Sequence, residues 1–398
     1  MRTTGADAGT AAVALTEAEL DRYVTHAPTR GLLATAGAPA DTGPLTFSPL
    51  RAHGLRTCAE ATEGPLRLAE ELRDRLVMGE LLSPAGTRRG AAGRESILLD
   101  GATGEISTAY LHRGSAPRPF APSLTTLLRF AAATEELAGL RGRFASLAGQ
   151  YGVATATEAS RRLLALFEEG TDGVLPPYWK ATALIRPLSL LAGPGTANGL
   201  TLEVPTRVLE QEFGPGRMAR FDEVDFPPTL THEPTRRFLR DAGLPEQASV
   251  FHADTDIPLP TLTEYAEEES LSGLPAHADH LIRVGALAEA HSLLLDGRTG
   301  AVLTYADDDG ALHPLNTDLS TLTFTLWLLH HEHTINTHLD GELTATAHDH
   351  LAAVMRETLG AVDGTGSEPG PGVSASSSAS ADWHYWTSLL ENEASGVL

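Results

Sequence analysis

The chain has almost no cysteine and almost no lysine. Among its 398 residues, Cys58 is the only cysteine and Lys180 the only lysine. One cysteine cannot form an intramolecular disulfide, and it excludes a zinc site or a deaminase centre built from several cysteines. A phosphate-binding Gly-x-x-x-x-Gly-Lys loop is also excluded, because Lys180 follows Tyr178 and Trp179 and no glycine.

Long apolar runs and nucleophile motifs are missing as well. No stretch reaches the roughly 18 apolar residues of a membrane helix, and the segment Met1–Asp7 has no apolar region typical of a secretory signal. There is no Gly-x-Ser-x-Gly sequence. We therefore expect a soluble, cytoplasmic protein that does not bind membranes, and no motif points to a cofactor or to catalysis.

Positive charge is scarce in the second half of the chain only. The formal net charge is −23; residues 1–200 are balanced, whereas residues 201–398 contain 9 basic and 32 acidic residues. An acidic surface repels nucleic acid and anionic lipid and attracts basic partners over long range. The asymmetry therefore predicts a basic protein partner and no nucleic acid, although acidic charge also serves solubility alone.

The chain does contain a tandem repeat. Residues 25–39, THAPTRGLLATAGAP, match residues 231–245, THEPTRRFLRDAGLP, at nine of fifteen positions. Two further matches follow in the same order, residues 96–104 with 292–300 and Tyr178-Trp179 with Tyr385-Trp386. Collinear matches with insertions only in loop-like sequence indicate a duplication with two copies.

The repeat predicts two domains, residues 1–195 (copy one) and residues 200–398 (copy two). The join at 192–199 is rich in glycine and has the composition of a flexible linker. We expect the first ~12 residues to be flexible and the Ser/Gly/Pro-rich insert at 364–381 to be disordered.

Each copy has the same predicted order of elements. A short helix has its N-cap at Thr235, or Thr29 in copy one, and ends at a glycine. Strands follow, and the Asp-Gly turns at 100–104 and 296–300 each carry two glycines suited to positive φ. Copy two is predicted to have strands at 281–287, 292–295 and 301–305 and helices at 319–338, capped by Thr317 or Asp318, and 347–359. Copy one is predicted to have helices at 124–151 and 158–169.

This order of elements gives an α+β fold class, in which each copy is a mainly antiparallel sheet with helices packed on it. Trp179 and Trp386, which match between the copies, are predicted to anchor the two cores.

A set of turn and core residues in copy two resembles a known family. The matching segments are Arg207–Gly214, Thr235–Leu239, Gly243–Pro245, Asp296–Gly300, Asn316–Leu322 and Trp386 with Leu389-Leu390. They resemble the fourth subgroup of the SUKH superfamily of bacterial immunity proteins over about residues 202–398. Copy one fits less well, because it has no equivalent of Glu212-Phe213-Gly214, and so resembles a diverged SUKH-like domain.

The resemblance implies a small α+β scaffold that neutralises a toxin of a polymorphic secretion system, often a nuclease, by binding it. It brings no catalytic residues, so the contact residues have to be inferred from charge. We predict that carboxylates of copy two occupy the surface where a basic toxin would bind its anionic substrate. The predicted contact residues are Asp254, Asp256, Glu267, Glu268, Glu269, Asp307, Asp308 and Asp309.

Two alternatives stay open. A general interaction scaffold or regulatory module without a toxin partner would have the same fold, and a toxin gene beside this one would distinguish the two. A metal-dependent enzyme is the third possibility, since His330, His333 and His338 share one face of a predicted helix and could hold a transition metal. The segment is not His-Glu-x-x-His, however, and an apolar Leu326–Leu329 run precedes it.

We expect the purified protein to contain no stoichiometric metal, because this histidine spacing matches no established ligand pattern. Elemental analysis of the full chain measures this directly. A transition metal present at one per chain and lost in the His330→Ala/His333→Ala variant would instead favour the metal-dependent enzyme.

Overall fold

The computed structural model describes residues 15–62, 68–81, 95–111, 116–171, 174–255, 258–271, 273–288, 291–306, 310–338, 342–365, 385–392 and 398. The chain forms two compact units. The first takes in the described residues up to Ala148 and Arg161–Lys180, and the second takes in Gly149–Ser160 and Ala181–Leu398. Because these units divide the chain at several points, the single domain boundary between residues 195 and 200 stays a prediction.

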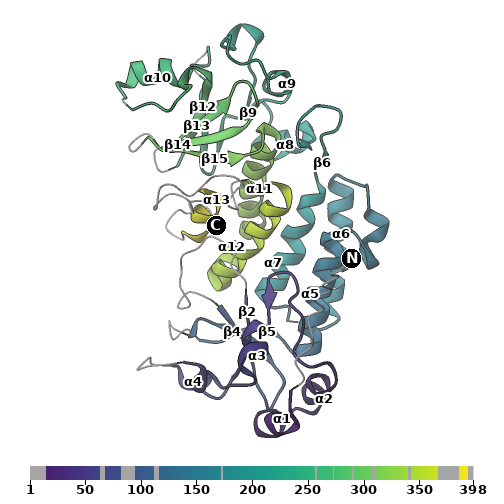
Figure 1. Ribbon diagram of the computed structural model, residues 1–398. Helices are drawn as coiled ribbons and strands as arrows, with labels where there is room; N and C mark the ends of the chain where they lie inside the picture. The colour runs from purple at the N-terminus through teal and green to yellow at the C-terminus, as the bar shows by residue number, and fades with distance from the viewer. Residues whose placement is uncertain are drawn as a thin grey trace, which may run out of the picture. The chain divides into compact units, whose positions relative to one another are not determined.

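Each unit contains one large antiparallel sheet whose strands follow chain order, as the α+β class predicts (Figure 1). The second unit also contains two two-stranded pairs, β6 Gly193–Pro194 with β7 Leu202–Glu203 and β8 Met218–Ala219 with β9 Leu244–Pro245. In the first unit the strands of the large sheet are β1 Leu45–Thr46, β2 Leu76–Leu81, β3 Glu95–Leu99, β4 Ile106–Ala109 and β5 Arg118–Ala121. In the second they are β10 Gln247–Ala248, β11 Phe251–Ala253, β12 Leu281–Leu287, β13 His291–Asp296, β14 Val302–Ala306 and β15 Leu312–Asn316. The strands predicted for copy two are confirmed to within a residue or two.

The two sheets share their irregularities as well as their order. In β2 the register shifts before Gly79, and in β12 it shifts before the matching Gly285. Strands β4 and β14 both shift after their first residue, Ile106 and Val302. Since a bulge is a specific local departure from the ladder, two bulges at matching positions support the duplication read from the sequence.

Helices cover both sheets. In copy one they are α1 Glu17–Tyr23, α2 Ala27–Ala36, α3 Ser48–His53, α4 Cys58–Ala61, α5 Leu124–Ala138, α6 Val153–Glu168 and α7 Pro177–Ile185. In copy two they are α8 Thr206–Phe213, α9 Glu233–Asp241, α10 Leu262–Glu269, α11 Leu319–His338, α12 Glu342–Val362 and α13 Tyr385–Glu391. In Figure 1, α10 lies on one side of the strands of the second sheet and α11 on the other.

The long helices differ between the copies. Helix α11 has the predicted bounds, and Asp318 caps it by accepting hydrogen bonds from the N–H groups of Ser320 (2.9 Å) and Thr321 (3.2 Å). The prediction that the matching helix reaches residue 151 is wrong, because α5 ends at Ala138. Leu140 and Gly142 have φ values of +45° and +54°, which a right-handed helix cannot accommodate.

The residues shared by the two copies dock a helix onto a turn, an arrangement that we call the helix–turn interlock. In copy two the carbonyl of Gly297 accepts hydrogen bonds from the N–H groups of Thr231 (2.8 Å) and His232 (2.9 Å). The Nδ1 atom of His232 lies 2.8 Å from Oγ1 of Thr235. Copy one repeats this with Gly101 as acceptor, Thr25 and His26 as donors, both at 2.9 Å, and His26 2.8 Å from Thr29.

The interlock corrects two predictions. The N-caps are His232 and His26, one turn earlier than predicted, and Thr235 and Thr29 lie inside the first turn of α9 and α2. Of the two glycines in the copy-two turn, only Gly300 has a positive φ, +78°. Gly297 is required for a different reason, because a Cβ atom there would collide with the carbonyl oxygen of Thr229.

The predicted tryptophan anchors are confirmed. Trp179 is 1% exposed and donates from Nε1 to the carbonyl of Phe120 in β5 at 2.8 Å. Trp386 is 2% exposed and donates to Oδ1 of Asn316 in β15 at 3.1 Å. Each indole thus satisfies its polar atom inside the core.

The join between the copies is not a free linker. Strands β6 Gly193–Pro194 and β7 Leu202–Glu203 form a hairpin. Asp318 at the start of α11 accepts hydrogen bonds from the N–H group (2.6 Å) and the hydroxyl (2.7 Å) of Thr201. The predicted flexibility of this segment is therefore wrong, because side chains distant in sequence hold it. Of the predicted disordered insert, residues 366–381 lie outside the described residues.

The close approach at Gly297 predicts a specific destabilisation. We expect Gly297→Ala to lower the free energy of unfolding by about 2 kcal/mol, because the added methyl group must push the Thr229 carbonyl away and weaken the interlock. Urea unfolding of the full chain measures this. Gly360→Ala is the matched control, since Gly360 lies in α12 with no atom within 4 Å of its Cβ position and should be neutral or stabilising. Equal effects of the two substitutions would contradict a structural role for the interlock.

Candidate partner-binding surface

Helix α10 presents the one predicted acidic group that the structure fully describes. The helix begins with a capping box, in which the Glu264 N–H donates to Thr261 Oγ1 (3.3 Å) and the Thr261 N–H donates to the Glu264 carboxylate (2.8 Å). Its buried side packs Leu262 against Leu281, Leu294 and Tyr305 of the sheet. Glu267, Glu268 and Glu269 form the end of the helix and are all exposed.

The matching helix of copy one is α4, and it is shorter. It begins with the same capping box, Thr57 with Glu60, and its cap bridges to β2 as Thr261 bridges to β12. Thr62 then has an extended conformation, so α4 ends after four residues, whereas α10 continues for eight. The added turn of α10 is where the three glutamates lie.

These glutamates work against the stability of the helix that carries them. They occupy the last turn of α10, where the helix dipole is negative and a carboxylate is unfavourable by roughly 0.3 kcal/mol or more each. Glu268 also follows Glu264 at the i,i+4 spacing, which is unfavourable for like charges. None of the three forms an ion pair within the part of the chain that the structure describes.

Asp254 lies in a different environment from the one predicted. Its carboxylate forms an ion pair with Arg283, and the two side chains are only 18% and 14% exposed. The Arg283 guanidinium also lies over the ring of Tyr265 in α10, 4.2 Å from its centroid. The expected exposed position of Asp254 is therefore wrong, because the residue holds Arg283 beneath α10.

Asp256, Asp307, Asp308 and Asp309 lie outside the described residues. The chain that follows the aspartate triplet is described, and a Cβ atom on Gly310 would lie 3.5 Å from the carbonyl oxygen of Gly273. Gly273 follows Glu269 by four residues. Gly310, which follows the triplet, and Gly273, which follows α10, therefore lie close together.

The histidines of α11 do not converge. His331 Nδ1 lies 2.7 Å from the carboxylate of Glu212 in α8, and its ring stacks on Trp327 at 4.6 Å. His330 lies against Phe213, 5.3 Å between ring centroids, whereas His333 is exposed. The side chain of His338 lies outside the described residues. No group of three metal-ligating side chains occurs across the described ranges, so nothing there assembles the metal site considered from sequence.

Glu332 is a residue whose environment the sequence did not reveal. Its side chain is 1% exposed, and neither carboxylate oxygen has a hydrogen-bond partner among the residues described. Burial raises the pKa of this carboxyl group to about 7. The side chain is therefore largely protonated below neutral pH, and its ionisation adds to the cost of burying it.

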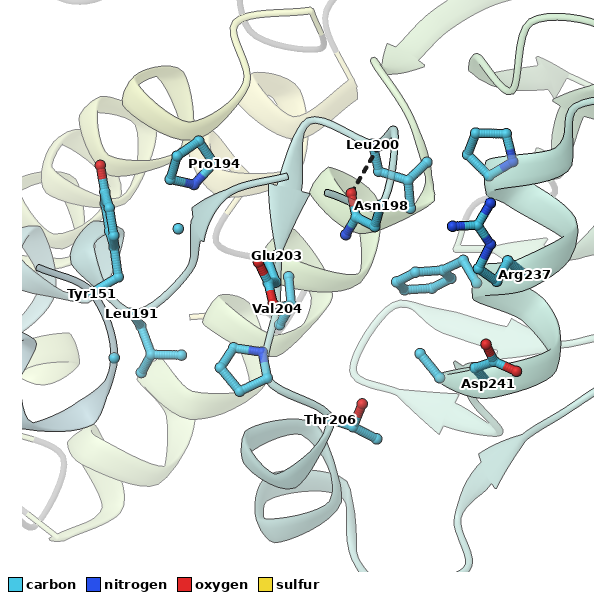
Figure 2. Close-up of a pocket in the computed structure, with 16 residues that line it drawn as sticks. Tyr151, Leu191, Pro194, Asn198, Leu200, Glu203, Val204, Thr206, Arg237 and Asp241 are labelled. Carbon is cyan, nitrogen blue, oxygen red and sulfur yellow. Dashed lines mark hydrogen bonds between the residues drawn. The ribbon is translucent and has the colours of Figure 1, made fainter. Parts of the chain in front are cut away.

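The structure also contains a groove that the sequence analysis did not single out. It has a volume of about 650 Å³ and lies between α9, the β6–β7 hairpin and the start of α8 (Figure 2). Its lining is mainly apolar and includes Tyr151 and Phe238. A signal was present in the sequence, since its lining includes non-identical positions of the fifteen-residue repeat, but only the fold shows that they face one cavity.

Comparison with known proteins agrees with the repeat and the fold. The family model described as SUKH-4 immunity protein matches residues 2–168 and 204–392. The chain therefore belongs to the SUKH-4 immunity protein family and contains two tandem SUKH copies. No curated protein and no solved structure shows detectable similarity to it. In the described part of the chain, no helix is long and apolar enough to cross a membrane.

Glu332 predicts an unusual pH dependence of stability. The pKa of Glu332 in the folded protein, about 7, exceeds the ordinary value of 4.5. The free energy of unfolding is therefore highest below pH 4.5, where the carboxyl group is protonated in both the folded and the unfolded state, and it falls as pH rises to about 7. The loss is on the order of 3 kcal/mol, from about 1.4 kcal/mol per pKa unit. We expect Glu332→Gln to be more stable than the parent protein at pH 8 but not at pH 4.5.

Urea unfolding at the two pH values measures this difference. The exposed Glu71→Gln should follow the parent protein at both. A Glu332→Gln variant whose stability stays parallel to the parent from pH 4.5 to 8 would show that the buried carboxyl group titrates normally.

Proposed function

We propose that the protein is a non-enzymatic immunity protein that binds a basic, nuclease-like toxin and neutralises it by occlusion. The acidic turn of α10 would cover the basic surface that the toxin uses to hold its anionic substrate. Asp256 and the triplet Asp307–Asp309 are proposed to extend the same acidic surface. Family membership supports toxin immunity in general, and charge supports the basic partner.

The observation that carries the proposal is the added acidic turn of α10. Both copies start this helix with the same capping box, and only copy two extends it with Glu267, Glu268 and Glu269. The extension places three carboxylates where the helix dipole and Glu264 disfavour them. A feature that costs stability and is present in one copy only is better explained by binding than by folding.

Electrostatic attraction suits the task of an immunity protein. Complementary charge steers encounter and can raise association rates by ten- to a thousandfold at low salt. The acidic copy would supply this attraction, and a toxin surface that binds phosphate groups would supply the opposite charge. Asp254 would act indirectly, because its ion pair holds Arg283 against Tyr265 under the acidic turn.

Copy one is proposed to act as a structural partner or a second recognition surface. Its charge is balanced, so it would contribute little to long-range attraction. This division assigns specificity for a basic toxin to copy two.

Neutralising the acidic turn tests the proposal. The probe is the product of the neighbouring gene, inactivated by mutation if it is a toxin, and we expect Glu268→Gln/Glu269→Gln to bind it roughly tenfold more weakly at low salt, with most of the loss in the association rate. The free energy of unfolding should be unchanged or higher, because the removed charges oppose the helix dipole. Binding kinetics at two salt concentrations and urea unfolding provide both measurements.

Glu168→Gln/Glu169→Gln is the matched control. These two glutamates are also exposed and also lie at the C-terminal end of a helix, α6, so their removal changes net charge and helix-end electrostatics equally. Equal weakening by both double variants would reduce the effect to net charge and contradict a specific acidic surface. Absence of any binding to the neighbouring toxin would overturn toxin immunity in favour of a general scaffold.

A further inference from the structure

The groove beside α9 has two unlike walls. Figure 2 shows Tyr151, Leu191 and Pro194 on one side and Arg237 and Asp241 on the other, with Glu203 and Val204 between them. Tyr151, which lines the groove, is 44% exposed. The cavity therefore runs from an aromatic and proline wall across the β6–β7 hairpin to α9.

Close contacts hold this groove in shape. A Cβ atom on Gly193 would lie 3.1 Å from the ring of Tyr151, and one on Gly199 would lie 3.0 Å from Pro234 at the start of α9. The β6–β7 hairpin, which contains both glycines, is tied to α11 through the hydrogen bonds from Thr201 to Asp318. A binding site that is already formed loses less entropy when a ligand enters it.

The two copies differ at three of the five positions that line the groove from the α9 region. Nine residues of the α9 region are identical in copy one and make the interlock, the helix ends and the core contact of Leu239. The groove-lining residues Arg237, Phe238 and Asp241 replace Gly31, Leu32 and Thr35 at the matching positions. The interlock and core residues are therefore shared, whereas the three groove-lining side chains that could contact a ligand most extensively differ between the copies.

Charge on this helix is also distributed unequally. Arg236 and Arg240 both pair with Glu223, Arg240 at 2.8 Å, and Asp241 lies 3.0 Å from Nε of Arg240. Arg237 is exposed and forms no ion pair with any residue that the structure describes. In a half of the chain with 32 acidic residues, an arginine left open beside an apolar groove is available for a carboxylate from outside.

We propose that this groove docks an extended segment of a partner protein in which an apolar or aromatic side chain lies next to a carboxylate. The apolar side chain packs against Phe238 and the prolines that line the groove, and the carboxylate pairs with Arg237. Aromatic and proline-lined grooves suit extended segments, and buried aromatic and arginine side chains dominate many interfaces. The partner is the toxin, so this assignment rests on the proposed function, but it places a second contact away from the acidic turn of α10.

The repeat supplies a variant that tests the groove with little risk to the fold. Arg237→Gly/Phe238→Leu/Asp241→Thr gives α9 the residues that α2 already carries at the matching positions, so the interlock and core contacts remain. We expect this variant to bind the inactivated neighbouring toxin about ten- to a hundredfold more weakly, mainly through faster dissociation. Circular dichroism should match the parent protein, and urea unfolding should show a loss of only about 1 kcal/mol, the cost of a glycine inside a helix.

Single arginine variants provide the matched pair. Arg237→Ala should weaken binding roughly tenfold, because it removes the cation that faces the groove. Arg207→Ala should have no effect, since Arg207 is likewise exposed and lacks an ion pair within the described ranges but does not line the groove. Equal effects of the two variants would overturn the carboxylate contact.

The outcomes separate the groove from the acidic turn. If Glu268→Gln/Glu269→Gln weakens toxin binding and the α9 triple variant does not, the groove assignment is wrong and the proposed function stands. If the toxin does not bind the parent protein, the proposed function fails, and a phage library of random twelve-residue peptides becomes the probe. Peptides with an apolar residue beside Asp or Glu that bind the parent and not the triple variant support the groove; any other selection result overturns it.

Discussion

A close approach between backbone atoms joins a helix start to a turn of the sheet in each copy. In each copy the carbonyl of a turn glycine, Gly101 or Gly297, accepts two N–H bonds from the residues that start a helix. A side chain on that glycine would collide with a neighbouring carbonyl, so the turn and the helix start constrain each other. Satisfying these N–H groups at a helix start removes orphan donors that would otherwise be unfavourable inside the protein.

The interlock holds the starts of α9 and α2, so exposed residues further along these helices can differ between the copies. The same separation holds for α4 and α10, which share a capping box and a contact with the sheet but differ in length. The two copies thus share the interactions that fold them and differ in the exposed surfaces of two helices. Copy two differs from copy one in the acidic turn of α10 and in the arginine and phenylalanine beside the groove of α9.

Buried polar groups show where the scaffold is less constrained. Trp179 and Trp386 both find an acceptor on the last strand of their sheet, but the acceptors are a main-chain carbonyl in one copy and Asn316 in the other. Glu332 has no acceptor or donor among the residues described, and burial raises its pKa to about 7. A packed core can therefore tolerate a carboxyl group in α11 as long as it remains protonated.

The sequence by itself determined the duplication, the α+β class, the order of strands and the tryptophan anchors, because these follow from local periodicity, turn chemistry and repeated spacing. It also placed Glu267, Glu268 and Glu269 on the surface. Only the tertiary structure decided that Asp254 pairs with Arg283, that the α11 histidines face different neighbours, that the inter-copy segment is a hairpin and that Arg237 and Tyr151 line one groove. These depend on which residues distant in sequence come together, and neither composition nor spacing along the chain contains that information.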